Sequence, residues 1–338
     1  MIRIGVVGAG SWGINHVRTF AQLPVCKLTM VADLSDKSLA ASKRIEPSVR
    51  TTKDHSELLA SDEVDAVVIS SSAETHFPIA KEALEHNKDI LIEKPFVLKI
   101  KEGEELVSLA ESKGRILMVG HLLKYHPAVI RLKELATSGA LGKVFYICSK
   151  RVNLGVVRAN ENALWSLAPH DISVMLYLLD RDPVMVAATG QSYIQKGIED
   201  VVFFALYFSS GEMCHGHVSW LDPHKIREFI VVGSKKMAVF DDMEATEKMK
   251  IYDKGVEGAP ESYASYGEAI AIRMGDIYVP WIRMVEPLRS EALHFLECVK
   301  ERKTPLTDGK DGMRVLRVLE AAQLSLRNGG TPVKLESH

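Results

Sequence analysis

A glycine motif follows directly after a mainly apolar run at the start of the chain. Residues 2–7 form that run, and residues 8–13 read Gly-Ala-Gly-Ser-Trp-Gly. Asp33 stands twenty positions after Gly13, at the end of a second apolar run. A strand, a glycine turn and a helix, with an acidic residue at this distance, are the fingerprint of a dinucleotide-binding βαβ unit. The pattern therefore predicts a site for a nicotinamide or flavin dinucleotide, and an ordinary glycine-rich turn would not account for Asp33.

Each glycine of the motif has its own expected task. Gly8 allows the tight turn after the strand, Gly10 lets the backbone approach a pyrophosphate, and Gly13 lets the helix pack closely on the strand. The first turn of that helix directs free N–H groups at the phosphates. Trp12 opens this helix, and we expect its side chain to pack while its neighbouring backbone contacts the cofactor.

The acidic residue also bears on the choice of cofactor. A carboxylate at Asp33 accepts a hydrogen bond from the ribose 2′-hydroxyl and repels a 2′-phosphate. The next residues are Leu34, Ser35 and Asp36, with no cation among them. The sequence therefore favours NAD, and NADP is the less favoured alternative.

The two parts of the chain differ in their patterns. Near-continuous apolar runs at 64–69, 90–92 and 116–119 alternate with expected helices at 77–86 and 101–113, which predicts an α/β domain with a doubly wound parallel sheet. Close-spaced strands are expected afterwards at 201–208, 213–220 and 227–232, so the second sheet is mostly antiparallel. Helices are expected at 164–179, 290–302 and 312–327, and exposed strands and turns at 241–260. We place the domains at residues 1–122 and 123–338.

Composition excludes several classes of protein. The 42 Lys and Arg against 44 Asp and Glu imply no basic face, so nucleic acid is not an expected partner. Four separated cysteines and a first strand starting at residue 2 favour a cytoplasmic chain without a signal peptide. The chain contains no run of about 18 apolar residues, so no membrane span is expected. No metal is expected, because the Cys-His-Gly-His at 214–217 offers too few ligands.

A second candidate motif, Glu93-Lys94-Pro95, comes directly after the expected strand at 90–92. In an open α/β sheet, ligands bind outside the carboxyl ends of the strands, which places Lys94 where a nicotinamide ring would lie. A partly desolvated lysine there can relay the proton of a substrate hydroxyl during hydride transfer. The alternative is a surface lysine beside a loop proline.

These motifs and two later ones resemble the glucose-fructose oxidoreductase, inositol dehydrogenase and MocA family. The later motifs are Gly-His-Leu-Leu-Lys-Tyr-His-Pro-Ala at 120–128 and Ala-Pro-His-Asp-Ile-Ser at 168–173. The resemblance implies NAD(P)-dependent oxidation or reduction of a carbohydrate, an N-terminal Rossmann domain and a C-terminal α/β domain. In that family the open sheet of the second domain often builds oligomers, so the resemblance implies a homo-dimer or homo-tetramer. The resemblance also implies these cofactor contacts: Gly8, Gly10, Ser11, Trp12, Gly13, Asp33, Ser70, Ser71, His76, Glu93 and Lys94.

A narrower set of motifs is similar to the UDP-N-acetylglucosamine 3-dehydrogenase group. They are Arg-Val-Asn-Leu-Gly at 151–155, Asn-Ala-Leu-Trp at 162–165, and Glu-Pro-Leu at 286–288 with His-Phe at 294–295. This similarity implies a nucleotide-sugar substrate, contacted by Lys94, Tyr125, Arg151, Asn153, Arg158 and His170. The two arginines suit a diphosphate because a guanidinium binds it bidentately, whereas the alternative is that they form surface salt bridges.

The sequence departs from the family at one position. The family commonly carries Asp four residues before the catalytic histidine, and here that position is Ser166. A serine supplies no charge to His170, so Lys94 is expected to carry the proton transfer and His170 to assist. The alternative is that His170 is a polar residue opening an amphipathic helix.

The sequence therefore predicts an NAD-dependent oxidoreductase acting on a carbohydrate hydroxyl, at C3 of a nucleotide sugar such as UDP-N-acetylglucosamine or its uronate. Two alternatives stay open. One is an inositol or free-sugar dehydrogenase of the same family. The other is a non-catalytic NAD-binding regulator on the same fold, which the missing carboxylate at Ser166 keeps in view.

Overall fold

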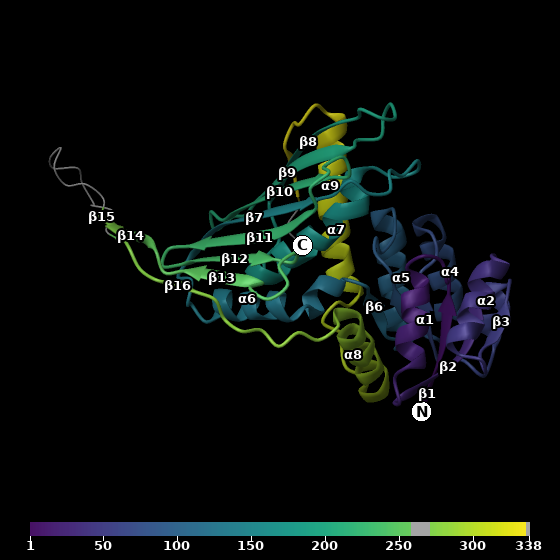
Figure 1. Cartoon of the computed structure of the whole chain (residues 1–338). Coiled ribbons are helices and arrows are strands. Elements are labelled where there is room, and N and C mark those ends of the chain that lie inside the picture. Colours follow the sequence, from purple (N-terminus) through teal and green to yellow (C-terminus); the bar gives the residue numbers. More distant parts are fainter. Residues whose placement is uncertain (258–270, 336–338) are drawn as a thin grey trace. The chain divides into compact units, whose positions relative to one another are not determined.

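The computed structural model describes residues 1–257 and 271–335, and they form two compact units (Figure 1). The first unit contains residues 1–125 and 285–317, and the second contains the described residues within 126–284 and 318–338. The expected single boundary at 122/123 thus lies close to the first crossing, but the chain crosses between the units again. It returns because α8 (Pro287–Glu301) places Ala292, Phe295 and Leu296 in the same buried core as β1 and α1.

The first unit is built on a parallel six-stranded sheet in the order β3-β2-β1-β4-β5-β6. Its strands are β1 (Ile2–Val7), β2 (Cys26–Ala32), β3 (Arg50–Thr52), β4 (Ala66–Ile69), β5 (Asp89–Ile92) and β6 (Leu117–Val119). Its helices are α1 (Gly13–Ala21), α2 (Asp36–Ile45), α3 (His55–Ala60), α4 (Ala73–Glu85) and α5 (Ile100–Ser112), followed by the short 3₁₀ helix η1 (Leu122–Tyr125). The order reverses between β1 and β4, which is where doubly wound sheets bind ligands.

The second unit is built on a nine-stranded mixed sheet in the order β16-β13-β12-β11-β7-β10-β9-β8-β17. All neighbouring strands run antiparallel except β7 and β10, which are parallel. The strands are β7 (Val144–Val152), β8 (Met185–Gln191), β9 (Val201–Tyr207), β10 (Met213–Ser219), β11 (Ile226–Gly233), β12 (Met237–Asp241), β13 (Met249–Tyr252), β16 (Ile277–Tyr278) and β17 (Val333–Lys334). The expected mostly antiparallel sheet is thus confirmed.

Helices cover one face of this second sheet. The helix α7 (Ala163–Leu179) packs on β7, β9 and β10, and α6 (Pro127–Thr137) packs on α7 and β12. The residues of β10 that face α7 are buried, whereas Met213 and His215 on its other face are exposed. Phe203 and His217 stack on that uncovered face with ring centroids 4.3 Å apart.

Three further elements complete the described chain. The long helix α9 (Gly309–Arg327) begins in the first unit and ends in the second. The strands β14 (Gly255–Glu257) and β15 (Ala271–Arg273) pair with one another. Exposed strands and turns were expected within 241–260. Strands are present there as β13 and β14, but β13 is not exposed, because it pairs within the large sheet and buries Met249 and Ile251. Residues 258–260 lie outside the described part.

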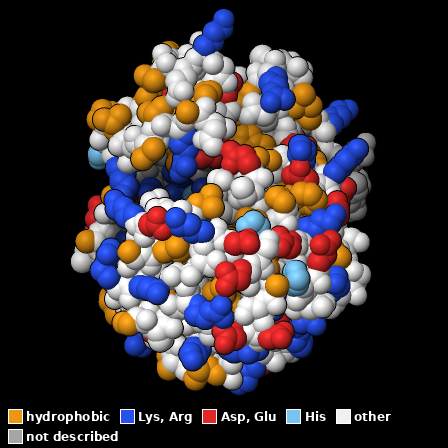
Figure 2. All heavy atoms as spheres, turned by 90° about the vertical axis from the view of Figure 1, so that its right-hand side faces the viewer, with side chains coloured by type: hydrophobic (Ala, Val, Ile, Leu, Met, Phe, Trp, Pro, Cys, Tyr) orange, Lys and Arg blue, Asp and Glu red, His pale blue; other side chains and the backbone are white. Residues whose placement is uncertain are grey.

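The surface carries both signs of charge. Figure 2 shows acidic and basic side chains interspersed over the face that it draws. Within the described ranges, no helix combines the length and the apolar character needed to cross a membrane.

Candidate cofactor and substrate residues

The register of the parallel sheet brings four predicted residues to one edge. Val7 pairs with Ala32 and with Ile69, and Ile69 pairs with Ile92. These four residues end β1, β2, β4 and β5, so the residues that follow them lie side by side at the carboxyl edge of the sheet. Those following residues are Gly8, Asp33, Ser70 and Glu93.

The glycine motif has the geometry that a dinucleotide needs. Gly8 has a φ of +87°, which favours glycine, and its N–H donates to the Ala32 carbonyl at 2.8 Å. A Cβ on Gly13 would lie 2.0 Å from the Gly8 carbonyl oxygen, so the helix can approach the turn only without a side chain. A Cβ on Gly10 would meet nothing within 4 Å, which leaves this backbone open to a ligand. The residues present thus fit a bound pyrophosphate.

Asp33 is fixed by the backbone on both sides of it. One carboxylate oxygen accepts the Ala9 N–H at 2.6 Å, and the other accepts the Ser35 N–H at 2.8 Å. Ser35 is itself the N-cap of α2. The carboxylate is therefore held directly beside the glycine turn, where a ribose hydroxyl would need an acceptor.

Glu93 is buried at the centre of the edge and accepts three hydrogen bonds. The Trp12 indole N–H donates at 2.5 Å and His16 Nε2 lies at 2.8 Å from Glu93 Oε1, while the Lys94 N–H donates to Oε2 at 3.1 Å. Burial acts to raise the pKa of Glu93, but the hydrogen bonds from His16 and Trp12 outweigh it, so the pKa lies below its usual range. Lys94, which is half-buried, therefore follows an ionised carboxylate.

His76 contacts two of the loops at this edge. Its side chain is buried, with Nδ1 2.9 Å from the Pro95 carbonyl and Nε2 3.2 Å from the Ser71 carbonyl. It therefore connects the loop after β4 to the loop after β5. Burial lowers the pKa of His76, and the neutral ring that this favours has one N–H, so it can donate to only one of the two carbonyls at a time.

In the second unit, His170 lies on α7, one turn after Ser166. The helix runs without a break through Pro169, and Asn162 caps its start by accepting the Trp165 N–H at 3.2 Å. His170 is half-buried and Ser166 is buried. The regularity of α7 therefore places the two side chains one above the other on the helix.

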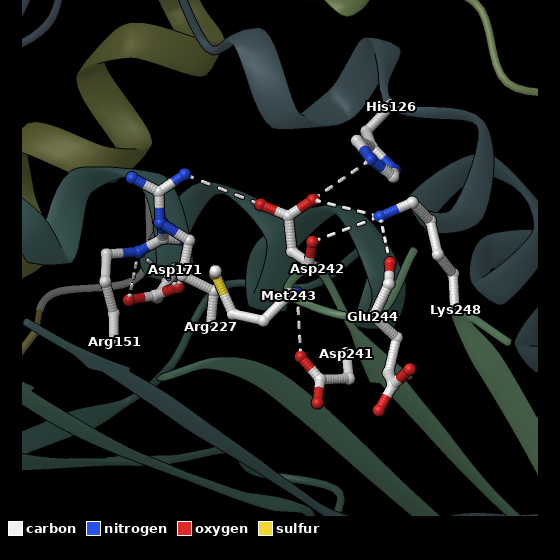
Figure 3. A network of polar contacts seen from close by, with 9 residues as sticks. All are labelled: His126, Arg151, Asp171, Arg227, Asp241, Asp242, Met243, Glu244 and Lys248. Carbon is white, nitrogen blue, oxygen red and sulfur yellow. Dashed lines mark hydrogen bonds and ion pairs between the residues drawn. The ribbon is translucent and has the colours of Figure 1, made fainter. Parts of the chain in front are cut away.

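Arg151 and Asp171 form a buried ion pair, which Figure 3 draws. Arg151 Nε lies 3.0 Å from both Asp171 oxygens, and Nη2 lies 2.9 Å from Oδ1. Only 7% of Arg151 and 1% of Asp171 are exposed. The residue expected to bind a diphosphate thus anchors α7 beside His170.

A second charged cluster lies in the same view around Asp242 (Figure 3). Its carboxylate is 3.4 Å from His126 Nε2 and 3.5 Å from an Arg227 nitrogen. The hydrogen bond from His126 is the main reason that the pKa of Asp242 falls to about 2. His126 Nδ1 accepts the Ala128 N–H at 3.2 Å and caps α6, so this histidine is structural.

The other predicted substrate contacts have differing environments. Arg158 is exposed and pairs with Glu161 at 2.8 Å. Asn153 follows β7, and its N–H donates to the Ser219 carbonyl at 3.1 Å. Tyr125 is buried with its hydroxyl 3.2 Å from Thr307 Oγ1, and burial raises the pKa of that hydroxyl.

Sequence reasoning missed a buried cluster in the first unit. Asp311 at the start of α9 lies 2.9 Å from His121 Nδ1 and 2.5 Å from Lys124 Nζ. Burial acts to raise the pKa of Asp311, but the hydrogen bond from His121 and the charge of Lys124 bring it to about 2. The motif at 120–128 contains His121 and Lys124, but no residue near them indicates their partner Asp311, which lies 187 residues after Lys124 in the sequence.

Metal-ligand groups are a separate matter. No group of three or more His, Cys, Asp or Glu suited to a metal is present among the residues that the structure describes. His215 and His217 lie on the uncovered face of β10, and His217 is stacked on Phe203.

Two family models match the chain. Residues 2–121 match the oxidoreductase family with an NAD-binding Rossmann fold, and residues 129–239 match the C-terminal domain of the same family. The chain belongs to the GFO/IDH/MocA oxidoreductase family. Its first unit is therefore an NAD-binding Rossmann domain, as the glycine motif predicts.

Individual relatives match almost the full chain at low identity. UDP-N-acetylglucosamine 3-dehydrogenase of Acidithiobacillus ferrooxidans is 27% identical over 96% of this chain and 96% of its own. The NAD(+)-dependent scyllo-inositol 2-dehydrogenase of Bacillus subtilis is 25% identical over 99% and 96%. The solved structure of GenD2 from gentamicin A biosynthesis, in complex with NAD, has a TM-score of 0.83 at 22% identity over 99% and 97%.

Proposed function

We propose that this protein is an NAD-dependent dehydrogenase for a nucleotide sugar, with C3 of UDP-N-acetylglucosamine or its uronate as the reacting carbon. The observation that carries the proposal is the edge built from Gly8, Asp33 and Glu93, with Lys94 directly after it. The choice of a nucleotide sugar follows the motifs at 151–155 and 162–165 and the named relative of Acidithiobacillus ferrooxidans.

In this proposal NAD supplies the hydride acceptor, held by the glycine turn and by Asp33. Lys94 takes the proton of the substrate hydroxyl, because a partly desolvated ammonium can lose its proton near neutral pH. His170 is the proposed assisting acid/base residue, as the family resemblance implies. Arg158 is the better candidate of the two arginines for a diphosphate, because its side chain is exposed, whereas that of Arg151 is buried against Asp171.

The substrate assignment is tested by a turnover screen. Purified protein with NAD is offered UDP-N-acetylglucosamine, its uronate, myo-inositol and scyllo-inositol, and free N-acetylglucosamine, and NADH formation is followed by absorbance. We expect turnover of a UDP-sugar, inhibition by UDP, and thermal stabilisation of the NAD-bound protein by UDP. Turnover of a polyol or free sugar without any effect of UDP would favour the inositol or free-sugar alternative.

The same screen addresses the regulator alternative. A non-catalytic regulator would bind NAD and turn over none of these compounds.

The oligomer implied by the family stays a prediction, resting on the uncovered sheet face that carries Phe203 and Met213. Sedimentation of the purified chain distinguishes a dimer or tetramer from a monomer.

Cofactor preference is a separate prediction, based on Asp33. We expect NAD to bind at least about tenfold more tightly than NADP, or about 1.4 kcal/mol, because the carboxylate repels a 2′-phosphate. Asp33→Ala should reduce the difference in affinity between NAD and NADP, chiefly by removing that repulsion. Calorimetric Kd values for both cofactors measure the effect, and Asp36→Ala, which changes an exposed carboxylate three residues later, is the matched control. Equal Kd values for NAD and NADP in the unchanged protein would contradict it.

A further inference from the structure

A short segment at one edge of the second sheet leaves most of its apolar side chains exposed. It is here called the strap and comprises residues 276–284, Asp-Ile-Tyr-Val-Pro-Trp-Ile-Arg-Met. The strap contains β16, the outermost strand of the sheet, and residues 279–284 continue past it without helix or strand (Figure 1). Trp281 is 83% exposed, and the exposed fractions of Ile277, Tyr278, Val279 and Met284 lie between 41% and 50%. Contiguous apolar surface of this kind marks a site of contact with another molecule.

The backbone of the strap is only weakly tied to the sheet. β16 pairs with β13 through Ile277 and Tyr278 alone. Within the described ranges, no backbone hydrogen bond joins residues 279–284 to another residue. Pro280 has no N–H to donate, so the strap is poorly suited to pair with a partner as a regular strand. A partner must therefore be held mainly by the side chains.

An apolar groove lies beside the strap. Its volume is about 430 Å³, and the lining residues include Tyr278, Val279 and Pro280 together with Leu135, Leu141 and Ile251. Pockets of about 300–1,000 Å³ hold small ligands, so this groove has room for one indole side chain. Trp281 directly follows the lining residues, yet its own side chain is in solvent. One chain thus presents both a groove and an exposed indole next to it.

The two charged residues of the strap lie near its opposite ends. Asp276 and Arg283 are exposed, and neither forms an ion pair among the residues that the structure describes. Two copies that aligned their straps in parallel would place like charges together. An antiparallel alignment instead brings the acidic end of each strap to the basic end of the other, which is favourable at both ends. Because Tyr278 and Trp281 are equally far from the centre of this alignment, it also brings each Trp281 toward the partner's Tyr278, which lines the groove.

We propose that the strap is a two-fold interface between two copies of this chain. The straps run antiparallel, and each Trp281 enters the groove of the other copy beside Tyr278. The same surface serves on both copies, so the contact closes on itself as a dimer. Arg131, which pairs with Glu134 at 2.8 Å, lines the groove and is 46% exposed, so its guanidinium can stack on the entering indole. This interface is separate from the uncovered sheet face and does not depend on the substrate proposed above.

The area that the strap offers is suited to a dimer contact. A stable interface buries about 800 Å² on each partner, and a buried tryptophan contributes about 150–250 Å² of it. Trp281 therefore supplies roughly a quarter of that area. The other exposed apolar side chains of the strap and the walls of the groove supply more. Large aromatic residues at the centre of an interface carry much of its binding energy, so we expect Trp281 to be the anchor.

The first test asks whether Trp281 is covered in the assembled protein. The chain has four tryptophans, so labelling with 5-fluorotryptophan gives four fluorine resonances, and Trp281→Phe identifies that of Trp281. The shift of a resonance between H₂O and D₂O reports how exposed its ring is. We expect a small isotope shift for Trp281 in the assembled protein and a large one after dilution to the monomer. A large shift in the assembled protein, or a chain that sedimentation shows to be monomeric at all concentrations, would overturn the proposal.

The second test removes the anchor. Trp281→Ala should raise the Kd of the dimer at least about tenfold in sedimentation equilibrium, whereas Tyr193→Ala, which changes a 68% exposed aromatic residue after β8, should leave it unchanged. Circular dichroism should show the same fold, because the indole is exposed in the single chain. If the uncovered sheet face also associates, the variant should form an assembly of half the mass. A Trp281→Ala variant with unchanged mass and Kd contradicts the interface.

The third test reverses charges to check the antiparallel alignment. Asp276→Arg leaves two cations on each strap and Arg283→Asp leaves two anions, so each variant should raise the Kd of the dimer by about tenfold. The double variant Asp276→Arg with Arg283→Asp exchanges the two ends, and it should return the Kd to within a few-fold of the unchanged value. Lys196→Asp, which reverses an exposed charge in the loop after β8, is the matched control and should have no effect. A double variant as weak as either single one would show that the straps do not align in this way.

Discussion

Lys94→Ala is expected to lower kcat by about 10²–10⁴-fold and to leave the Kd of NAD within a few-fold. The size of the loss is that of general acid–base catalysis, which the amine supplies in the proposed reaction. The affinity for NAD should persist because the glycine turn and Asp33 remain in place. Single-turnover kinetics and calorimetry measure the two quantities separately, and Lys99→Ala removes an exposed amine from the same loop as a matched control.

The comparison with His170 decides which residue moves the proton. His170→Ala should cost less than Lys94→Ala, because Ser166 gives the imidazole no carboxylate partner. Ser166→Asp should raise the pKa of His170 by placing a negative charge one helical turn away. Near-normal turnover in Lys94→Ala, or a larger loss in His170→Ala, would show that the proton transfer is assigned to the wrong residue.

The parts of the candidate site that the sequence predicts are those whose chemistry is local. Gly8 and Gly13 are required by a turn and by a close approach within a few residues, so their spacing alone indicates both. Asp33 and Glu93 follow recognisable buried strands, and strands of a parallel sheet end at a common edge. The register of β1, β2, β4 and β5 confirms that edge.

What the sequence could not predict depends on partners far along the chain. Glu291 is a charged residue on α8, but this helix belongs to the first unit and its side chain is fully buried there. The single expected boundary at 122/123 does not include this return, because the helical pattern of 290–302 does not indicate which core the helix joins. Arg151 likewise suits an anion, and only the packing of α7 on β7 shows Asp171 as its partner.

The ion pair of Arg151 and Asp171 gives the largest expected effect on stability. Asp171→Asn should lower the free energy of unfolding by about 3–5 kcal/mol, because it leaves a buried guanidinium without its counter-charge. Urea unfolding followed by circular dichroism measures the change. The pair of Arg158, which is exposed, and Glu161, which is partly buried, is the matched control, and Glu161→Gln should cost about 0–1 kcal/mol.

A double replacement separates the pair's own contribution from the cost of breaking it. Arg151→Met with Asp171→Leu removes both charges and retains apolar volume, so it should recover most of the stability that Asp171→Asn loses. The double variant should be more stable than Asp171→Asn for the following reason. In the native pair the free-energy cost of desolvating the two ions largely cancels their attraction, whereas in Asp171→Asn no attraction compensates the cost of desolvating Arg151. A double variant as unstable as Asp171→Asn would instead show that the geometry of the pair, and not its charge balance, holds α7 on the sheet. An Asp171→Asn cost below about 1 kcal/mol would mean that water reaches the guanidinium, and that Arg151 is available to bind an anion after all.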